Sequence, residues 1–165
     1  MTQNAVGISI NAPSTYEVVN TKQPCFLGIL SGADSNVTGD GTIFTMGSGN
    51  AYTEIVDQNA DFNTNGTFTC PITGVCFFCG THSFGGILAA HTKVEIKVVT
   101  SNLTYICTRY EADQMKNSDG EENLSFTATA DMDAADTATF TLTVSNGTLV
   151  VDTTTDSFVS GALLV

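Results

Sequence analysis

The run of residues 66–78, Gly-Thr-Phe-Thr-Cys-Pro-Ile-Thr-Gly-Val-Cys-Phe-Phe, constrains the fold of this chain more than any other segment. Phe68 and Cys70 are two residues apart, so they lie on the same face of an extended strand. Pro71 cannot donate a hydrogen bond to the ladder of a sheet, and Gly74 opens a second apolar strand after a turn. The segment therefore predicts a strand, a corner and a second strand.

Short segments of strand character recur along the rest of the chain, separated by turn residues. The clearest is 93–98, in which Val94, Ile96 and Val98 alternate with polar residues and are expected to face a core. Further strands are expected at residues 16–19, 25–30, 41–46, 52–56, 103–110, 124–130, 139–144, 148–151 and 158–165, and loops at 57–66, 80–91 and 111–123. This rhythm is typical of an all-β sandwich or jelly roll, and periodicity alone does not choose between the two.

The composition is that of a single domain with hydroxyl-rich strand faces. The 165 residues are 42% hydrophobic, which is enough for one sizeable core. Charged residues make up only 13%, against about 25% in ordinary soluble domains, and threonine and serine fill the polar positions. The net charge of -12 would repel a nucleic-acid backbone and an anionic membrane, and it would attract basic partners or divalent cations. Nucleic acid and membrane insertion are therefore not expected.

Residues 1–24 are expected to form an N-terminal arm, and residues 25–165 the folded domain. The first residues are polar, and no export signal precedes the first core strand. The cysteines are Cys25, Cys70, Cys76, Cys79 and Cys107. An odd number leaves at least one thiol unpaired in a monomer. Without an export signal, free buried thiols are expected.

The run 66–78 resembles the consensus Phe-Thr-Cys-Pro-x-x-Gly-x-Tyr-x-Phe of the globular head of complement component 1q, within the complement and tumour necrosis factor superfamily. Residues 157–164 are similar to that family's closing strand, and residues 132–138 to the entry of its penultimate hairpin. Two positions depart from the pattern, because Cys76 replaces a tyrosine and Gly80 an aromatic residue, so core volume must be supplied elsewhere. The family-motif positions expected in the core are Phe62, Phe68, Pro71, Gly74, Cys76, Phe78, Phe158, Gly161 and Leu163.

The resemblance covers residues 25–165 and implies a ten-stranded jelly-roll β-sandwich of the complement 1q and tumour necrosis factor type. It also implies a tight homotrimer, with the chain ends gathered at one end and variable loops at the other. It implies no catalysis. Because the sequence also lacks a Gly-x-Ser-x-Gly elbow or a comparable nucleophile motif, an enzyme is not expected.

Two groups of residues have spacings that suggest metal ligands. Cys76 and Cys79, followed by His82 and His91, would suit zinc, but residues three apart on a strand point to opposite faces, so core thiols are the favoured interpretation. The acidic residues Asp119, Glu121, Asp131, Asp133 and Asp136 are candidates for calcium, which some members of the family bind. Neither acidic cluster has the glycine and terminal glutamate of a complete calcium loop, so solvated loops and no cofactor are favoured.

Two roles fit this interpretation. In the first, the protein is a non-enzymatic virion component, a capsid decoration or fibre-head protein made in the host cytoplasm and displayed on the virion surface. Its partners would be two further copies of itself, a capsid or other virion protein bound through residues 1–24, and a cell-surface receptor or glycan. In the second, it is a secreted, extracellular trimeric ligand or recognition domain. The missing export signal and the absence of collagen-like Gly-x-y repeats favour the first role.

Overall fold

The computed structural model describes residues 23–111 and 120–164, and within these residues the chain forms strands and no helices. The strands are β1 (Cys25–Leu30), β2 (Ile43–Thr45), β3 (Tyr52–Gln58), β4 (Phe62–Asn63), β5 (Thr67–Thr69), β6 (Gly74–Gly85), β7 (Lys93–Thr100), β8 (Thr104–Glu111), β9 (Glu121–Met132), β10 (Thr137–Ser145), β11 (Asp152–Thr153) and β12 (Phe158–Leu163). The expectation of an all-β fold is confirmed.

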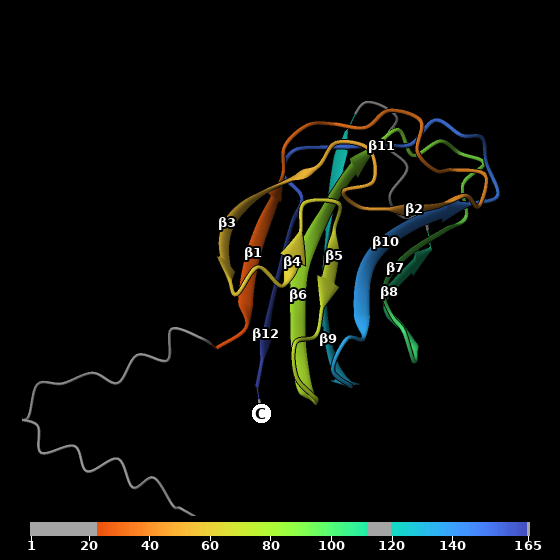
Figure 1. Cartoon of the computed structure of the whole chain (residues 1–165). Helices are drawn as coiled ribbons and strands as arrows, with labels where there is room; N and C mark the ends of the chain where they lie inside the picture. Colours follow the sequence, from red (N-terminus) through yellow and green to blue (C-terminus); the bar gives the residue numbers. More distant parts are fainter. Residues whose placement is uncertain (1–22, 112–119, 165) are drawn as a thin grey trace, which may run out of the picture.

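The strands form two antiparallel sheets that pack face to face (Figure 1). In the first sheet, the order is β9-β6-β12-β1-β3. The short strand β11 also pairs with β6, beyond the part of β6 that pairs with β12. In the second sheet, the order is β8-β7-β10-β5-β4, with β2 pairing a different part of β10 from β5. Apart from the β4-β5 and β7-β8 hairpins, neighbouring strands are not consecutive in sequence, which is the topology of a jelly roll and not of a simple meander.

Aromatic side chains fill the space between the sheets. The ring of Phe26 from β1 stacks on Phe62 with centroids 4.3 Å apart and on Phe68 at 5.3 Å. Phe78 from β6 meets Phe68 and Phe140 edge-on at 5.5 and 5.6 Å. All five rings are buried, and they come from both sheets. The motif therefore builds the centre of the core, where such ring pairs add stability beyond their buried area.

Phe126 supplies the volume that Gly80 leaves out. A Cβ atom at Gly80 would lie 2.7 Å from the ring of Phe126 and 2.4 Å from the carbonyl oxygen of Phe158. The glycine therefore allows a ring from the neighbouring strand β9 to lie over β6. The aromatic group is kept but comes from another strand.

Several strand boundaries differ from those expected. Residues 80–85 continue β6 and are not a loop, because β9 pairs with β6 along its whole length. Residues 62–63 form β4 within an expected loop, and β9 begins at Glu121. The expected strand at 148–151 is wrong, since only Val151 makes an isolated bridge before β11. The expected strand at 16–19 lies outside the described residues.

The two ends of the described chain lie together at one end of the sandwich (Figure 1). The backbone N–H of Leu163 donates to the carbonyl oxygen of Pro24 at 2.9 Å. Residues 31–42, 86–92 and 146–151 form loops at the other end. The chain therefore enters and leaves the domain at the end opposite these loops.

Candidate interaction face

The outer face of the first sheet carries three rows of uncharged side chains across five strands. Cross-strand partners share a face, so the register of the ladders identifies each row. The rows are Val56, Leu27, Ser160, Cys79 and Thr127; Gln58, Cys25, Ala162, Phe77 and Thr129; and Thr53, Ile29, Phe158, Thr81 and Ser125. We call these residues the neutral face. They include no charged side chain, in a chain whose net charge is -12.

The centre of the neutral face is apolar and accessible. Ile29 and Phe158, on the inner strands β1 and β12, are 40% and 37% exposed, and Val56, on the edge strand β3, is 41% exposed. A shallow hollow of about 260 Å³ opens between β1, β12 and β6, with Cys25 and Cys79 among the residues that line it. Water therefore contacts apolar surface that a partner would cover.

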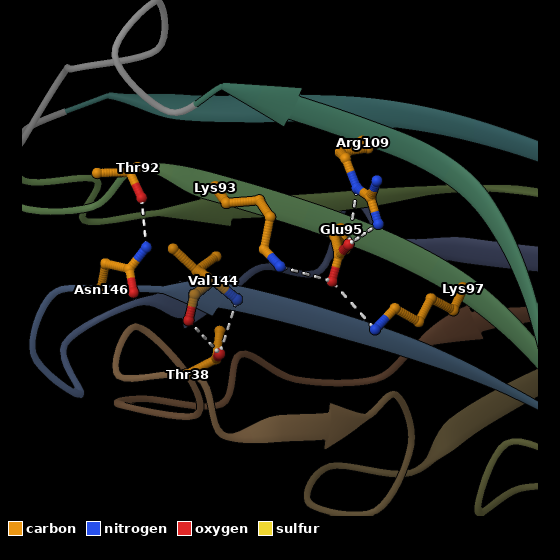
Figure 2. Close-up of polar contacts among 8 residues, drawn as sticks. All are labelled: Thr38, Thr92, Lys93, Glu95, Lys97, Arg109, Val144 and Asn146. Atoms are coloured by element: carbon orange, nitrogen blue, oxygen red, sulfur yellow. Dashed lines mark hydrogen bonds and ion pairs between the residues drawn. The ribbon is translucent and has the colours of Figure 1, made fainter.

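The outer face of the second sheet carries the opposite arrangement, a charged cluster around Glu95 (Figure 2). The Glu95 carboxylate is only 4% exposed. Arg109 donates from Nε and Nη2 to Oε1 at 2.8 and 2.6 Å, and the Nζ atoms of Lys97 and Lys93 lie 3.0 and 3.4 Å from Oε2. These three cations are the only Lys and Arg side chains in residues 23–111 and 120–164.

Opposing effects set the pKa of Glu95. Burial raises it, and the hydrogen bonds and charges of Lys97, Arg109 and Lys93 outweigh the burial and lower it from 4.5 to about 2. The carboxylate is therefore ionised at neutral pH, and its hydrogen-bonding positions are filled by residues of the same sheet. We interpret this cluster as part of the fold and not as a site for a ligand.

Solved structures supply the comparison that sequence searches do not. No protein-family model matches the sequence, and no curated protein matches it. The globular domain of zebrafish complement 1qA protein superposes with a TM-score of 0.59 at 14% identity, covering 87% of this chain and 98% of that one. Murine APRIL gives 0.54 at 8% identity, covering 87% and 100% of the two chains, and Eiger TNF from S. frugiperda gives 0.52 at 11%, covering 87% and 94%. The fold is the complement 1q and tumour necrosis factor jelly roll.

Most of the motif residues lie where this jelly roll needs them. Fully or nearly fully buried are Phe62, Phe68, Cys76, Phe78, Gly161 and Leu163. Pro71 and Gly74 are half-buried, because they form the corner between β5 and β6. The expectation that Phe158 lies in the core is wrong. Val159 and Leu163 of the same strand face the core, so Phe158 faces outward.

The zinc candidates are not brought together. Cys76 is buried in the core and Cys79 lies on the neutral face, as the strand geometry predicts. His82 packs on Phe126 in the core, with ring centroids 5.0 Å apart. His91 accepts a hydrogen bond at Nδ1 from the Leu88 N–H at 2.8 Å, and its Nε2 lies 3.1 Å from the carbonyl oxygen of Thr148.

The calcium candidates are also dispersed. Glu121 and Asp131 stand near opposite ends of β9, and Asp119 lies outside the described residues. One Asp136 oxygen accepts from the Asp133 N–H at 2.8 Å and from the Asn102 amide at 2.6 Å, so this carboxylate closes a turn. Within the described part of the chain, no three His, Cys, Asp or Glu side chains are placed to hold a metal ion together.

The sequence interpretation missed the neutral face as a site. A signal for it exists, since residues 25–30 and 75–79 are continuous apolar runs. Such runs are typical of strands that are covered on both faces, whereas a strand with one wet face alternates. In these two runs, the described residues fully bury the side chains of one face only.

Proposed function

We propose that the protein is a non-enzymatic binding module that assembles as a homotrimer through the neutral face. The observation that carries this proposal is an uncharged, partly apolar surface across five strands of a strongly acidic chain. Identical subunits with a charge of -12 repel one another, so they associate best through a surface that brings no carboxylates together. The jelly-roll fold supports three as the number of copies, since the family it resembles forms trimers.

Trimer formation would give the loops their binding function. The loops lie at the end opposite Pro24 and Leu163, so a symmetric trimer presents three identical sets of loops on one side. A hollow of about 610 Å³, lined by residues that include Ser35, Gly86 and Asp152, lies at this end. Simultaneous contact through three sets would raise avidity for a surface-bound receptor or glycan.

For the biological setting, we propose a virion structural protein, either a capsid decoration or a fibre head. All five cysteines are free thiols, which fits synthesis in a reducing cytoplasm. Pro24 lies beside Leu163, at the end opposite the loops. Residues 1–24 would attach the domain to a capsid protein, with residues 25–165 as the displayed domain. Among the described residues, no helix is long and apolar enough to cross a bilayer.

A secreted trimeric ligand or recognition domain is the second candidate. The observation that favours it is the similarity of the fold to a complement globular domain and to tumour necrosis factor proteins. The genomic neighbourhood distinguishes the two settings. Portal and capsid genes beside this one support the virion role, and an upstream leader with Gly-x-y repeats contradicts it.

Sedimentation velocity tests the assembly. At micromolar concentration, we expect a species of about 52 kDa, three times the 17.3 kDa of one chain. Leu27→Asp places a carboxylate in the middle of the neutral face and should shift the population to monomer without unfolding the domain. Val99→Asp, a half-buried apolar position on the outer face of the second sheet, is the matched control and should leave the trimer intact.

The outcome separates the neutral face from other surfaces. A wild-type monomer at this concentration contradicts the homotrimer. A trimer that persists in a folded Leu27→Asp variant, or that is lost equally in Val99→Asp, contradicts assembly through this face.

A further inference from the structure

Cys70 and Cys76 bring two thiols into contact between the sheets. Cys70 directly follows β5 of the second sheet, and Cys76 lies in β6 of the first. Their Sγ atoms are 3.6 Å apart, and both side chains are completely buried. A disulfide has a sulfur–sulfur distance of about 2.05 Å, so the two sulfur atoms need only about 1.5 Å of further approach.

Hydrogen bonds hold both backbones in place. The approach of the two sulfur atoms would therefore come from rotation of the side chains. The Cys70 N–H donates to the Asp136 carbonyl at 2.7 Å, and the Cys70 carbonyl accepts from the Ala135 N–H at 2.8 Å. Cys76 pairs with Ala130 on one side and Leu163 on the other. The Cys70 thiol now donates to the Ile72 carbonyl at 3.0 Å, and turning it toward Cys76 gives up this weak bond.

The other three thiols have different surroundings. Cys25 and Cys79 belong to the neutral face, and Cys107 donates to the Tyr105 carbonyl in β8 at 3.5 Å. A disulfide of Cys70 with Cys76 would join the two sheets directly across the core. Such a bond would add a second covalent link to the corner of residues 71–75, which already joins β5 to β6 at this point.

We propose that Cys70 and Cys76 form a disulfide that ties the two sheets together when the chain meets a small-molecule disulfide such as oxidised glutathione. One protein thiolate attacks the glutathione disulfide, breaks its sulfur–sulfur bond and releases one glutathione thiolate. The second protein thiolate then attacks the mixed disulfide, forms the protein disulfide and releases the second glutathione thiolate. The two protein thiols lose two protons and two electrons, and one glutathione disulfide is reduced to two thiols.

Burial determines when the reaction occurs. Burial, together with the hydrogen bond and charge of Cys70, raises the pKa of the Cys76 thiol to about 12, so the reactive thiolate is scarce in the closed sandwich. The exchange therefore proceeds while the sheets are apart, during folding or local opening. The same burial protects the finished bond from reductants in the native state.

The experiment compares protein refolded from denaturant in a glutathione redox buffer with protein refolded in excess reductant. Each sample is then unfolded, alkylated with iodoacetamide and analysed by intact mass and peptide mapping. After oxidation, we expect three alkylated cysteines out of five and one peptide that links Cys70 to Cys76. Closing this short loop should raise Tm by about 5–10 °C over the reduced sample.

Variants assign the effect to this pair. In Cys70→Ser and in Cys76→Ser, the redox dependence of Tm should disappear and all four remaining cysteines should be alkylated. Cys79→Ser, three residues from Cys76 but on the neutral face, should keep both the linkage and the rise in Tm. Five alkylated cysteines in the oxidised wild type, or a linkage between other cysteines, overturns the proposal, whether or not the serine variants fold.

Discussion

The outer face of the first sheet has no charge in its central rows, whereas the outer face of the second sheet gathers three cations around one carboxylate. Both faces belong to the same sandwich and cover the same core. On the second sheet, Glu95 finds all its partners within the chain. On the first sheet, exposed Ile29 and Phe158 find none within the described residues. A face whose charged groups are paired within the chain can stay exposed to solvent. A face that exposes large apolar side chains is a candidate surface for a binding partner.

The threonines on the two outer faces also differ in their exposure to solvent. Thr127 and Thr129 stand exposed on the neutral face. Thr141 and Thr143, on the outer side of β10, are 4% and 5% exposed, and their hydroxyl groups lack a hydrogen-bond partner among the described residues. The hydroxyl-rich outer side of β10 is therefore closed to solvent at these two positions, unlike the neutral face. These hydroxyl groups lie beside Glu95 and Lys97 in the register of β7.

Glu95→Gln is the substitution that should most affect the self-contained face. It removes the negative charge and leaves Lys93, Lys97 and Arg109 close together without a counter-charge. Removing one partner of a buried ion pair typically costs several kcal/mol, so we expect a loss of about 3 kcal/mol in unfolding free energy at pH 7. Urea denaturation measures the change.

Glu54→Gln on the exposed strand β3 is the control, and it should change stability by less than about 0.5 kcal/mol. The trimer should survive in both variants, because Glu95 and the neutral face lie on opposite sides of the sandwich. A Glu95→Gln variant as stable as the wild type would show that the cluster contributes nothing to folding and would remove the contrast between the faces.

The pH dependence of stability should distinguish the contribution of His82, in the core beneath the first sheet, from that of the charged cluster on the second sheet. His82 is completely buried, and burial lowers its pKa from 6.5 to about 4. The folded state therefore keeps this ring neutral while the unfolded chain binds a proton below pH 6.5. Stability is unaffected by His82 above pH 6.5 and is lost as the pH falls from 6.5 to 4, by about 3 kcal/mol in total.

Glu95 acts in a lower pH window. Its folded pKa of about 2 lies below the unfolded value of 4.5, so its contribution is present above pH 4.5 and is lost as the pH falls to 2. Denaturation curves recorded from pH 8 to 2 should show two steps. His82→Met should remove the upper step alone, and Glu95→Gln the lower step alone. A slope between pH 6.5 and 4 that is unchanged in His82→Met contradicts this assignment.

The sequence predicts which residues of a strand face the core better than it predicts the ends of strands or the surface. The strand at 25–30 and the alternation of Val94, Ile96 and Val98 are confirmed, because both depend on the period of the strand itself. The Gly-rich end of β6 was expected to be a loop, since glycine weakens a strand locally. Pairing with β9 stabilises this end, and that partner is some forty residues away in the chain.

The two outer faces, including the candidate site on the first sheet, were harder to predict, because they depend on the register between strands. Alternation places Glu95 on the outer face, where a charged residue is normally wet. Its burial depends on Lys93, Lys97 and Arg109, and the expected hairpin brings Arg109 opposite Glu95 across β7 and β8. Phe158 was assigned to the core by resemblance, although its parity with Val159 and Leu163 points outward. Sequence patterns predict which face a side chain occupies more reliably than what covers that face.

Lys93→Gln tests the smallest difference, between the inner and outer cations of the cluster. The Lys93 side chain is 38% exposed and lies 3.4 Å from the Glu95 carboxylate, whereas Lys97 is 18% exposed and lies at 3.0 Å. Water and salt screen the more exposed pair, so Lys93→Gln should cost at most about 0.5 kcal/mol, and Lys97→Gln about 1 kcal/mol. Urea denaturation at 0.05 and 0.5 M NaCl measures both variants. The loss of stability in Lys93→Gln should become smaller at high salt, and the loss in Lys97→Gln should largely persist. The buried Glu95 carboxylate is shielded from dissolved ions on the side of Lys97, just as it is inaccessible to a binding partner. Equal costs with equal salt dependence would place the whole cluster in solvent contact and make the second outer face as open as the first.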